Sequence, residues 1–170
     1  LFDVARHARE HDPDGFGLDT FAKVEDMPFT FPNGCHAAEI EIDPDTGQVD
    51  LVRYVSAEDY GTILNLQLII AQVSGGIAQG IGQAISELAA YDHSSGQLIT
   101  GSLMDYQLLK ADNLPPLEIN LEDGQATAAN PLGVKGAGQA GAIAAPQTII
   151  NAILDALSPL GIEHLDMPAT

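Results

Sequence analysis

Hydrophobic and polar residues alternate along two neighbouring stretches of the chain, residues 34–42 and residues 49–57. A period of two is typical of β-strands that bury one face. Residues 43–47, with the sequence D-P-D-T-G, separate the two stretches and favour a turn. The pattern therefore predicts a β-hairpin. The residues expected on the two buried faces are Ala38, Ile40 and Ile42 in the first strand and Val49, Leu51, Arg53, Val55 and Ala57 in the second.

The pattern changes to a helical period near Leu66, with Asn65 as the expected N-cap. One side of this helix is apolar, whereas the opposite side carries amides and no charge. The apolar side is expected to hold Ile70, Val73, Ile77, Ile81, Ala84 and Ile85, and the polar side Gln72, Gly76, Gln79 and Gln83. Because exposed helices usually carry charged residues, the pattern predicts a helix enclosed on both sides. Its amides would meet either another domain or a heterocyclic ligand with matching donors and acceptors.

The remaining pattern is less regular. Residues 87–92 and 117–121 are expected to form strands, and residues 142–157 an apolar helix that tolerates Pro146 only in its first turn. Residues 2–10 are expected to form a short helix within a connector, or within the end of a preceding element, that covers residues 1–25. The predicted fold class is α+β, with a β-hairpin and short mixed sheet packed against two long helices.

Composition narrows the range of functions. The chain has 170 residues and a net charge of −18, with six Lys and Arg in total, which disfavours binding to nucleic acid or to anionic membranes. A single cysteine, Cys35, excludes an intrachain disulfide and a thiolate-rich metal site. His7 and His11 are spaced like metal ligands, but they lie in a weakly patterned region, so no metal site is predicted. We expect no membrane insertion, because polar residues interrupt the uncharged stretch at 60–86.

A glycine-rich segment occupies residues 130–141, N-P-L-G-V-K-G-A-G-Q-A-G. Its last six residues fit the dinucleotide pattern G-x-G-x-x-G, but that motif requires a buried strand directly before it. The preceding residues, with Asn130 and Pro131 among them, cannot form such a strand, so nucleotide binding is disfavoured. Two interpretations remain: a tight loop that caps a buried helix, or backbone N–H groups that face an anion or oxyanion.

Taken together, these segments resemble the large, molybdopterin-binding subunit of the xanthine dehydrogenase/aldehyde oxidase family. Residues 72–82, Q-V-S-G-G-I-A-Q-G-I-G, are similar to its Q-x-x-G-G-x-x-Q-G-x-G segment, and residues 133–138 are similar to its G-V-K-G-x-G-E loop. Residues 100–106, T-G-S-L-M-D-Y, match T-G-S-x-x-D-Y, and residues 31–39 resemble the usual strand entry. The resemblance covers about residues 30–160. It implies that residues 26–170 are the C-terminal part of the cofactor-binding domain.

The resemblance implies an oxidoreductase that hydroxylates an aldehyde or N-heterocycle with water as the oxygen source. The expected cofactor is molybdopterin, with FAD and [2Fe-2S] clusters on partner modules. The expected partners are the remainder of the large subunit, the iron–sulfur and FAD subunits, and further copies in a homo-oligomeric assembly, in the cytoplasm or alternatively the periplasm. The residues that the resemblance assigns to cofactor binding are Gln72, Gly75, Gly76, Lys135, Gly136 and Gly138.

The chain departs from the family motif at Gln139, where the family has a glutamate that acts as general base. A carboxylate can accept a proton near neutral pH, whereas a carboxamide cannot, and losing a general base costs roughly 10²–10⁴ in rate. Three explanations are open: diverged chemistry, a deliberate Glu→Gln substitution, or a base supplied elsewhere. The chain alone is not expected to be active. The alternative function is a non-catalytic structural or assembly module derived from this family.

Overall fold

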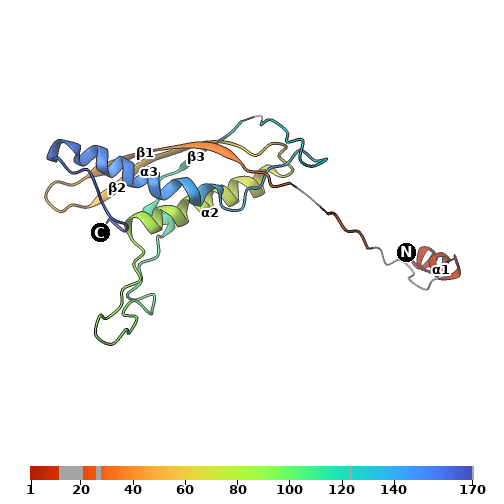
Figure 1. The fold of residues 1–170 in the computed structure, drawn as a ribbon, viewed down its shortest axis with the longest axis horizontal. Helices are drawn as coiled ribbons and strands as arrows, with labels where there is room; N and C mark the ends of the chain where they lie inside the picture. Colours follow the sequence, from red (N-terminus) through yellow and green to blue (C-terminus); the bar gives the residue numbers. More distant parts are fainter. Residues whose placement is uncertain (12–20, 26–27, 123, 170) are drawn as a thin grey trace.

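The computed structural model describes residues 1–11, 21–25, 28–122 and 124–169. Figure 1 shows an elongated body of helices and strands, with the first helix set apart from it. In chain order, the elements are α1 (Phe2–His11), β1 (Asn33–Ile42), β2 (Val49–Asp59), α2 (Leu66–Ile85), the 3₁₀ turn η1 (Ala111–Asn113), β3 (Leu117–Leu121), α3 (Ala140–Leu157) and the 3₁₀ turn η2 (Ser158–Leu160).

The three strands form one mixed sheet in the order β1-β2-β3. Strands β1 and β2 pair antiparallel as the predicted hairpin, whereas β2 and β3 pair in parallel. The turn between β1 and β2 is closed by the carboxylate of Asp43, which accepts hydrogen bonds from the backbone N–H groups of Asp45 and Thr46. Gly47 follows with a φ of 76°, a conformation that glycine adopts without steric cost. The hairpin and the mixed sheet are thus confirmed.

The predicted buried face of β2 is wrong beyond Leu51. The pairing register shifts between Glu39 and Ile40. Glu39 pairs with Arg53 and Ile40 pairs with Leu51, so Val52 is an extra residue on β2. Such a β-bulge reverses which side of the strand faces the core. Val49 and Leu51 are half-buried as expected, but the buried residues after the bulge are Tyr54, Ser56 and Glu58 rather than Arg53, Val55 and Ala57.

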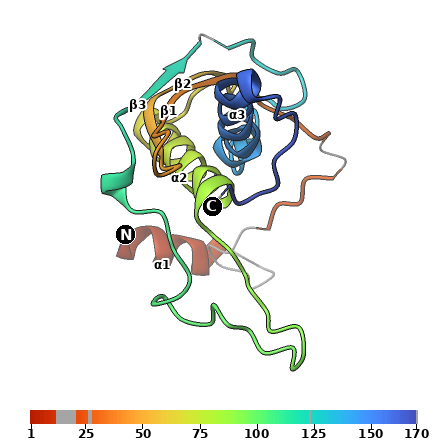
Figure 2. The ribbon, with the colours of Figure 1, turned by 90° about the vertical axis from the view of Figure 1, so that its left-hand side faces the viewer.

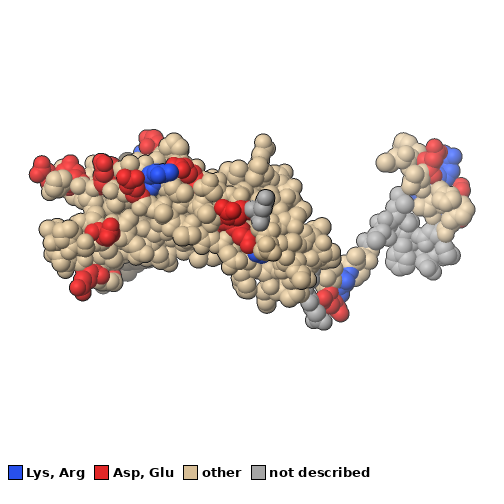
Figure 3. Space-filling view, turned by 90° about the horizontal axis from the view of Figure 1, so that it is seen from above, with Lys and Arg blue, Asp and Glu red and all other residues tan. Residues whose placement is uncertain are grey.

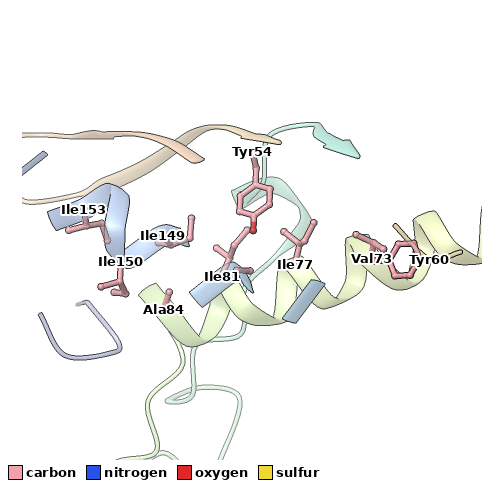
Figure 4. Close-up of a cluster of buried hydrophobic side chains, with 10 residues drawn as sticks. Tyr54, Tyr60, Val73, Ile77, Ile81, Ala84, Ile149, Ile150 and Ile153 are labelled. Carbon is pink, nitrogen blue, oxygen red and sulfur yellow. The ribbon is translucent and has the colours of Figure 1, made fainter. Parts of the chain in front are cut away.

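Helices α2 and α3 pack against each other and against one face of the sheet, as Figure 2 shows along the long axis. Helix α2 begins where expected: the Asn65 side chain accepts a hydrogen bond from the Leu68 N–H. The side chains between these layers form one apolar core, drawn in Figure 4. Its buried members are Tyr54, Tyr60, Val73, Ile77, Ile81, Ala84, Ala145, Ile149, Ile150 and Ile153. The α+β prediction is confirmed.

Small residues bring α2 and α3 close together. A Cβ atom built on Gly80 would lie 2.7 Å from the Ala145 Cβ and 2.8 Å from the Pro146 Cδ. One built on Gly76 would lie 2.9 Å from the Ala142 backbone nitrogen. All three distances are too short for a real side chain, so glycine is required by helix packing at these positions. Gly76 therefore faces α3 and is buried, rather than lying on the exposed side with the glutamines.

Helix α3 and the segment after α2 differ from expectation. Helix α3 starts at Ala140, so Pro146 lies beyond its first turn. The proline ring is buried against Gly80, and this packing compensates for the missing N–H. Residues 87–92 are not a strand: an isolated bridge joins Tyr91 to Leu98. The segment after α2 extends away from the sheet in Figure 1.

The N-terminal helix is confirmed as α1, and none of its residues is buried. Two helical stretches, Leu66–Ile85 and Ala140–Leu160, are long and apolar enough to cross a membrane by length and composition, but the core helices of soluble proteins pass the same test. Here their apolar faces supply most of the core between α2, α3 and the sheet.

Candidate functional site

The structure joins the amide side of α2 to the glycine-rich segment. The Gln72 Nε2 donates a hydrogen bond to the Gly138 carbonyl oxygen at 2.5 Å. Gln139 follows directly, at the N-cap position of α3, where its side chain makes no capping hydrogen bond. All three residues are exposed. Two segments that are 66 residues apart in the sequence thus present their polar groups at one surface.

The glycine loop, defined here as residues 133–138, is held by backbone hydrogen bonds to residues just after β2 and to Thr127. The Gly133 carbonyl accepts from the N–H groups of Thr62 at 3.0 Å and Thr127 at 3.2 Å. The Lys135 N–H donates to the Tyr60 carbonyl at 2.9 Å. Gly133 has a φ of 69°, which favours glycine. These bonds define the path of the loop between β2 and α3.

The Lys135 side chain turns inward rather than toward solvent. Its Nζ lies 2.6 Å from the Asp59 Oδ2, and the side chain is 11% exposed. The other carboxylate oxygen of Asp59 accepts the Gly61 N–H at 2.7 Å. The hydrogen bonds from Lys135 and from the Gly61 backbone hold the pKa of Asp59 below its ordinary value. The charge of Lys135 is therefore already paired within the chain.

The glycines that resemblance assigned to the cofactor differ in their surroundings. A Cβ atom at Gly75 or Gly138 would meet nothing within 4 Å, and at Gly136 it would meet only the Thr30 carbonyl oxygen at 3.5 Å. These three glycines are exposed, whereas Gly76 is buried against α3. Glycine inside a helix is destabilising by about 0.5–1 kcal/mol relative to alanine. No packing contact with the described residues accounts for Gly75, which suits the close approach of a ligand or partner.

A buried polar network lies beneath the sheet end, and sequence reasoning missed it. The His36 Nε2 is 2.8 Å from the Glu58 Oε1, and its Nδ1 is 2.7 Å from the Tyr54 hydroxyl. The Tyr60 hydroxyl donates to the Glu58 Oε2 at 2.7 Å. The His36 and Glu58 side chains are each 2% exposed. The alternation over 49–57 placed Tyr54 on the face opposite Leu51, and Glu58 and Tyr60 lay beyond that stretch. The sequence carries no signal of the bulge that turns Tyr54 inward.

The electrostatics of this network follow from burial and hydrogen bonding. Burial pushes the pKa of Glu58 upward, but the hydrogen bonds from His36 and Tyr60 outweigh it, so the pKa lies below its ordinary value. Burial raises the pKa of Tyr54 and Tyr60 well above the ordinary value, and both hydroxyls stay protonated. Both carboxylate oxygens of Glu58 accept hydrogen bonds in this network. The network is therefore suited to stabilise the end of β2, next to Asp59.

Two surface cavities lie elsewhere on the molecule. One of about 710 Å³ is lined by the β1–β2 turn, the end of α2 near Ser86, and Asn113. Another of about 460 Å³ is formed within residues 103–110. Neither is lined by Gln72 or by the glycine loop. Among the residues that the structure describes, no group of three or more His, Cys, Asp or Glu side chains could hold a metal ion.

Residues 5–115 match the model of a family described as a molybdopterin cofactor-binding domain. The match ends before the glycine loop and α3, but relatives align across that part as well. The chain belongs to this family, within the group of xanthine dehydrogenase, carbon monoxide dehydrogenase and aldehyde oxidoreductase large subunits.

Curated relatives extend the match along the chain. The chain is 44% identical over 162 residues to the nicotine 6-hydroxylase large subunit of Paenarthrobacter nicotinovorans, covering 93% of the chain and 19% of the relative. It is 31% identical over 174 residues to the carbon monoxide dehydrogenase large chain of Hydrogenophaga pseudoflava, covering 100% and 21%. The chain thus spans about a fifth of the length of the curated relatives it matches.

Solved structures share the fold. Quinoline 2-oxidoreductase from Pseudomonas putida 86 superposes with a TM-score of 0.75 at 37% identity, covering 78% of this chain and 17% of that one. Carbon monoxide dehydrogenase from Oligotropha carboxidovorans superposes with a TM-score of 0.76 at 30% identity, covering 81% and 17%. The chain is a portion of the cofactor-binding domain of a molybdenum hydroxylase large subunit.

Proposed function

We propose that the exposed side of α2 and the glycine loop form one wall of the molybdopterin pocket. The observation that carries this proposal is the hydrogen bond from Gln72 to the Gly138 carbonyl, which joins the two segments at one surface. The rest of the large subunit would supply the other walls, because the chain spans about a fifth of its relatives. When bound, molybdopterin supplies the metal centre at which a substrate is hydroxylated.

The residues at this surface fit a pterin. A carboxamide has two N–H donors and a carbonyl acceptor, so Gln72 can bond Gly138 and still offer groups to a heterocycle. Gly75, Gly136 and Gly138 have no side chain that would keep a flat ligand away from the backbone. The exposed part of α2 carries no charge, which suits a pocket that excludes water around an uncharged ring system.

Gln139 would face the reacting groups of the intact site. Its carboxamide can hydrogen-bond a substrate or a hydroxyl, but it cannot take up the proton that the family's glutamate accepts. We infer that the protein binds the cofactor and turns over slowly by the family's usual route. The relatives named for nicotine and quinoline favour an N-heterocycle over an aldehyde as the substrate. Electrons would then pass to iron–sulfur and FAD partner subunits in a homo-oligomeric assembly, in the cytoplasm or the periplasm.

The test is the cofactor content of the assembled large subunit. In a Gln72→Ala variant we expect roughly three- to tenfold less bound molybdenum and pterin at limiting supply, since one net hydrogen bond contributes about 0.5–1.5 kcal/mol. Gln83→Ala is the matched control, because Gln83 is also exposed on α2 but about three turns away. Equal cofactor content in the two variants would contradict the proposed wall.

A second candidate function follows from Gln139. If the missing carboxylate reflects lost chemistry, the chain belongs to a non-catalytic module that assembles with partner subunits. Molybdenum and pterin analysis of the wild-type assembly separates the two functions. A complex that retains its partner subunits but contains neither molybdenum nor pterin would establish the module and refute the cofactor site.

A further inference from the structure

One ion pair connects the glycine loop to the sheet. Asp59 is the last residue of β2, and its carboxylate is held on both oxygens, by the Lys135 Nζ at 2.6 Å and by the Gly61 N–H at 2.7 Å. The Lys135 side chain is 11% exposed and that of Asp59 is 24% exposed. Removing one partner from a mostly buried pair leaves an uncompensated charge, which is destabilising. The pair therefore couples the position of Lys135 tightly to β2.

The backbone around this pair is closely packed. Gly61 has a φ of 66°, and a Cβ atom there would clash with the Gly133 carbonyl oxygen and lie 3.3 Å from the Lys135 Cγ. The Lys135 N–H also bonds the Tyr60 carbonyl. Three residues further on, the Gly138 carbonyl reaches Gln72 on α2. The side-chain ion pair and these backbone contacts thus lie along one path from β2 through the loop to the cofactor-facing surface.

We propose that Asp59 and Lys135 are positioning residues, whose ion pair holds the glycine loop so that Gly138 and Gln139 face the ligand beside Gln72. This rests on the proposed function of that surface. Lys135 acts on the ligand indirectly, by anchoring the loop. Its own ammonium group does not contact the ligand, because it is already paired with Asp59. The family resemblance assigned no role to Asp59. In this proposal Asp59 is as important as Lys135 for holding the loop in position.

A double-mutant cycle on the large subunit, prepared without cofactor, tests this directly. Amide hydrogen exchange is measured on a peptide that covers residues 133–140 in Asp59→Asn, Lys135→Met and the double variant. We expect each variant to exchange about tenfold faster than the wild type, with the double variant no faster than either single variant, because the two side chains act as one pair. Arg53→Met is the matched control, since it breaks the exposed Arg53–Glu118 pair on the same strand and should leave this peptide unchanged.

A second readout uses the loaded subunit. Asp59→Asn and Lys135→Met should lose molybdenum and pterin equally, whereas a lysine that contacts the ligand directly would give loss in Lys135→Met alone. Unchanged exchange in Asp59→Asn, or effects that add in the double variant, would overturn the proposal. If a neutral variant fails to fold, Lys135→Arg and Asp59→Glu replace it, because they keep the charges. In these variants the peptide should exchange faster than in the wild type but slower than a fully unprotected peptide. A wild-type subunit without molybdenum or pterin would instead refute the proposed function, while the exchange results would still decide the role of the pair.

Discussion

At position 139 the chain offers a carboxamide on an exposed surface beside Gly138 and Gln72. A carboxamide and a carboxylate have nearly the same shape, so the difference between them at this position is chemical rather than steric. The difference is also reversible by one substitution, which makes it the most accessible test of the reaction chemistry. A neighbouring glutamine on the same helix, Gln147, is also exposed and provides a control.

We predict that Gln139→Glu in the assembled enzyme raises kcat/KM at least tenfold. The expectation follows from the roughly 10²–10⁴ contribution of a positioned general base. The restored activity should fall at low pH, as the new carboxylate becomes protonated, and steady-state rates across pH measure both effects. Gln147→Glu should leave kcat/KM unchanged. An activity that stays the same in both variants would mean that another group serves as the base.

Glu58 gives a second prediction at the residue scale, concerning stability against pH. Its pKa is lowered in the folded protein from an ordinary value of 4.5, because the hydrogen bonds from His36 and Tyr60 outweigh its burial. A lowered folded-state pKa means that the stabilisation is present above pH 4.5 and is lost as the pH falls through the folded-state pKa. Glu58→Gln should remove this part of the pH dependence of the free energy of unfolding.

The same substitution should lower the free energy of unfolding at neutral pH by about 1–3 kcal/mol, because buried partners lose a charged hydrogen-bond acceptor. Urea unfolding followed between about pH 3 and pH 7 measures both effects. Glu118→Gln, at an exposed position, is the control and should have a much smaller effect at neutral pH. A Glu58→Gln variant with wild-type stability and pH dependence would contradict the account of the network.

At the scale of elements, packing explains one glycine on α2 but not another. Gly80 is buried against Ala145, whereas Gly75 meets nothing within 4 Å. We predict that Gly80→Ala lowers the free energy of unfolding by about 1–3 kcal/mol through overpacking. Gly75→Ala should raise it by about 0.5–1 kcal/mol, because alanine has the higher helix propensity. Denaturant unfolding of the two variants measures this contrast.

Cofactor retention should not follow stability in the Gly75→Ala variant. If a ligand approaches the backbone at Gly75, the stabilised Gly75→Ala variant should still retain less molybdenum and pterin than the wild type. Loss of stability in Gly75→Ala would show that the chain itself requires glycine at this position, which would contradict the prediction. Full cofactor retention in the same variant would show that the ligand does not approach α2 there.

The sequence predicted the elements better than it predicted their faces. The strands expected at 34–42, 49–57 and 117–121 and the Asn65 cap depend on local preferences, and all are confirmed. The bulge at Val52 depends on pairing between strands and leaves no local period, so Arg53, Val55 and Ala57 were assigned to the same face as Val49 and Leu51, and Tyr54 to the opposite one. For the site, the motifs predicted which segments meet, but the partner of Lys135 is set by tertiary contacts alone.

At the scale of the whole molecule, the surface is acidic but has an uncharged part. Acidic side chains are spread over the face in Figure 3, with few Lys or Arg among them. In contrast, α2 carries no charge, and its first turns expose apolar residues. These are Leu66 at 54%, Leu68 at 68% and Ile70 at 38% exposure, with Leu64 just before them at 67%. Exposed apolar patches of this kind mark contact surfaces.

We predict that this end of α2 is covered by the remainder of the large subunit. Leu68→Glu should change the stability of the 170-residue chain by less than about 0.5 kcal/mol, because the side chain is exposed there. In the full-length subunit it should strongly reduce the yield of folded, assembled complex, since a charge would be buried without a partner. Size-exclusion chromatography of both forms measures this, and normal assembly of the full-length variant would contradict the prediction.

The central claim is that Gln72 and the glycine loop face one bound molybdopterin. An experimental structure of the assembled large subunit with its cofactor tests it most directly. The account predicts a polar atom of the cofactor within hydrogen-bonding distance of the Gln72 carboxamide, about 2.7–3.2 Å, with Gly138 in contact with the same ligand. A cofactor bound on another surface, with Gln72 and Gly138 covered by protein instead, would contradict it.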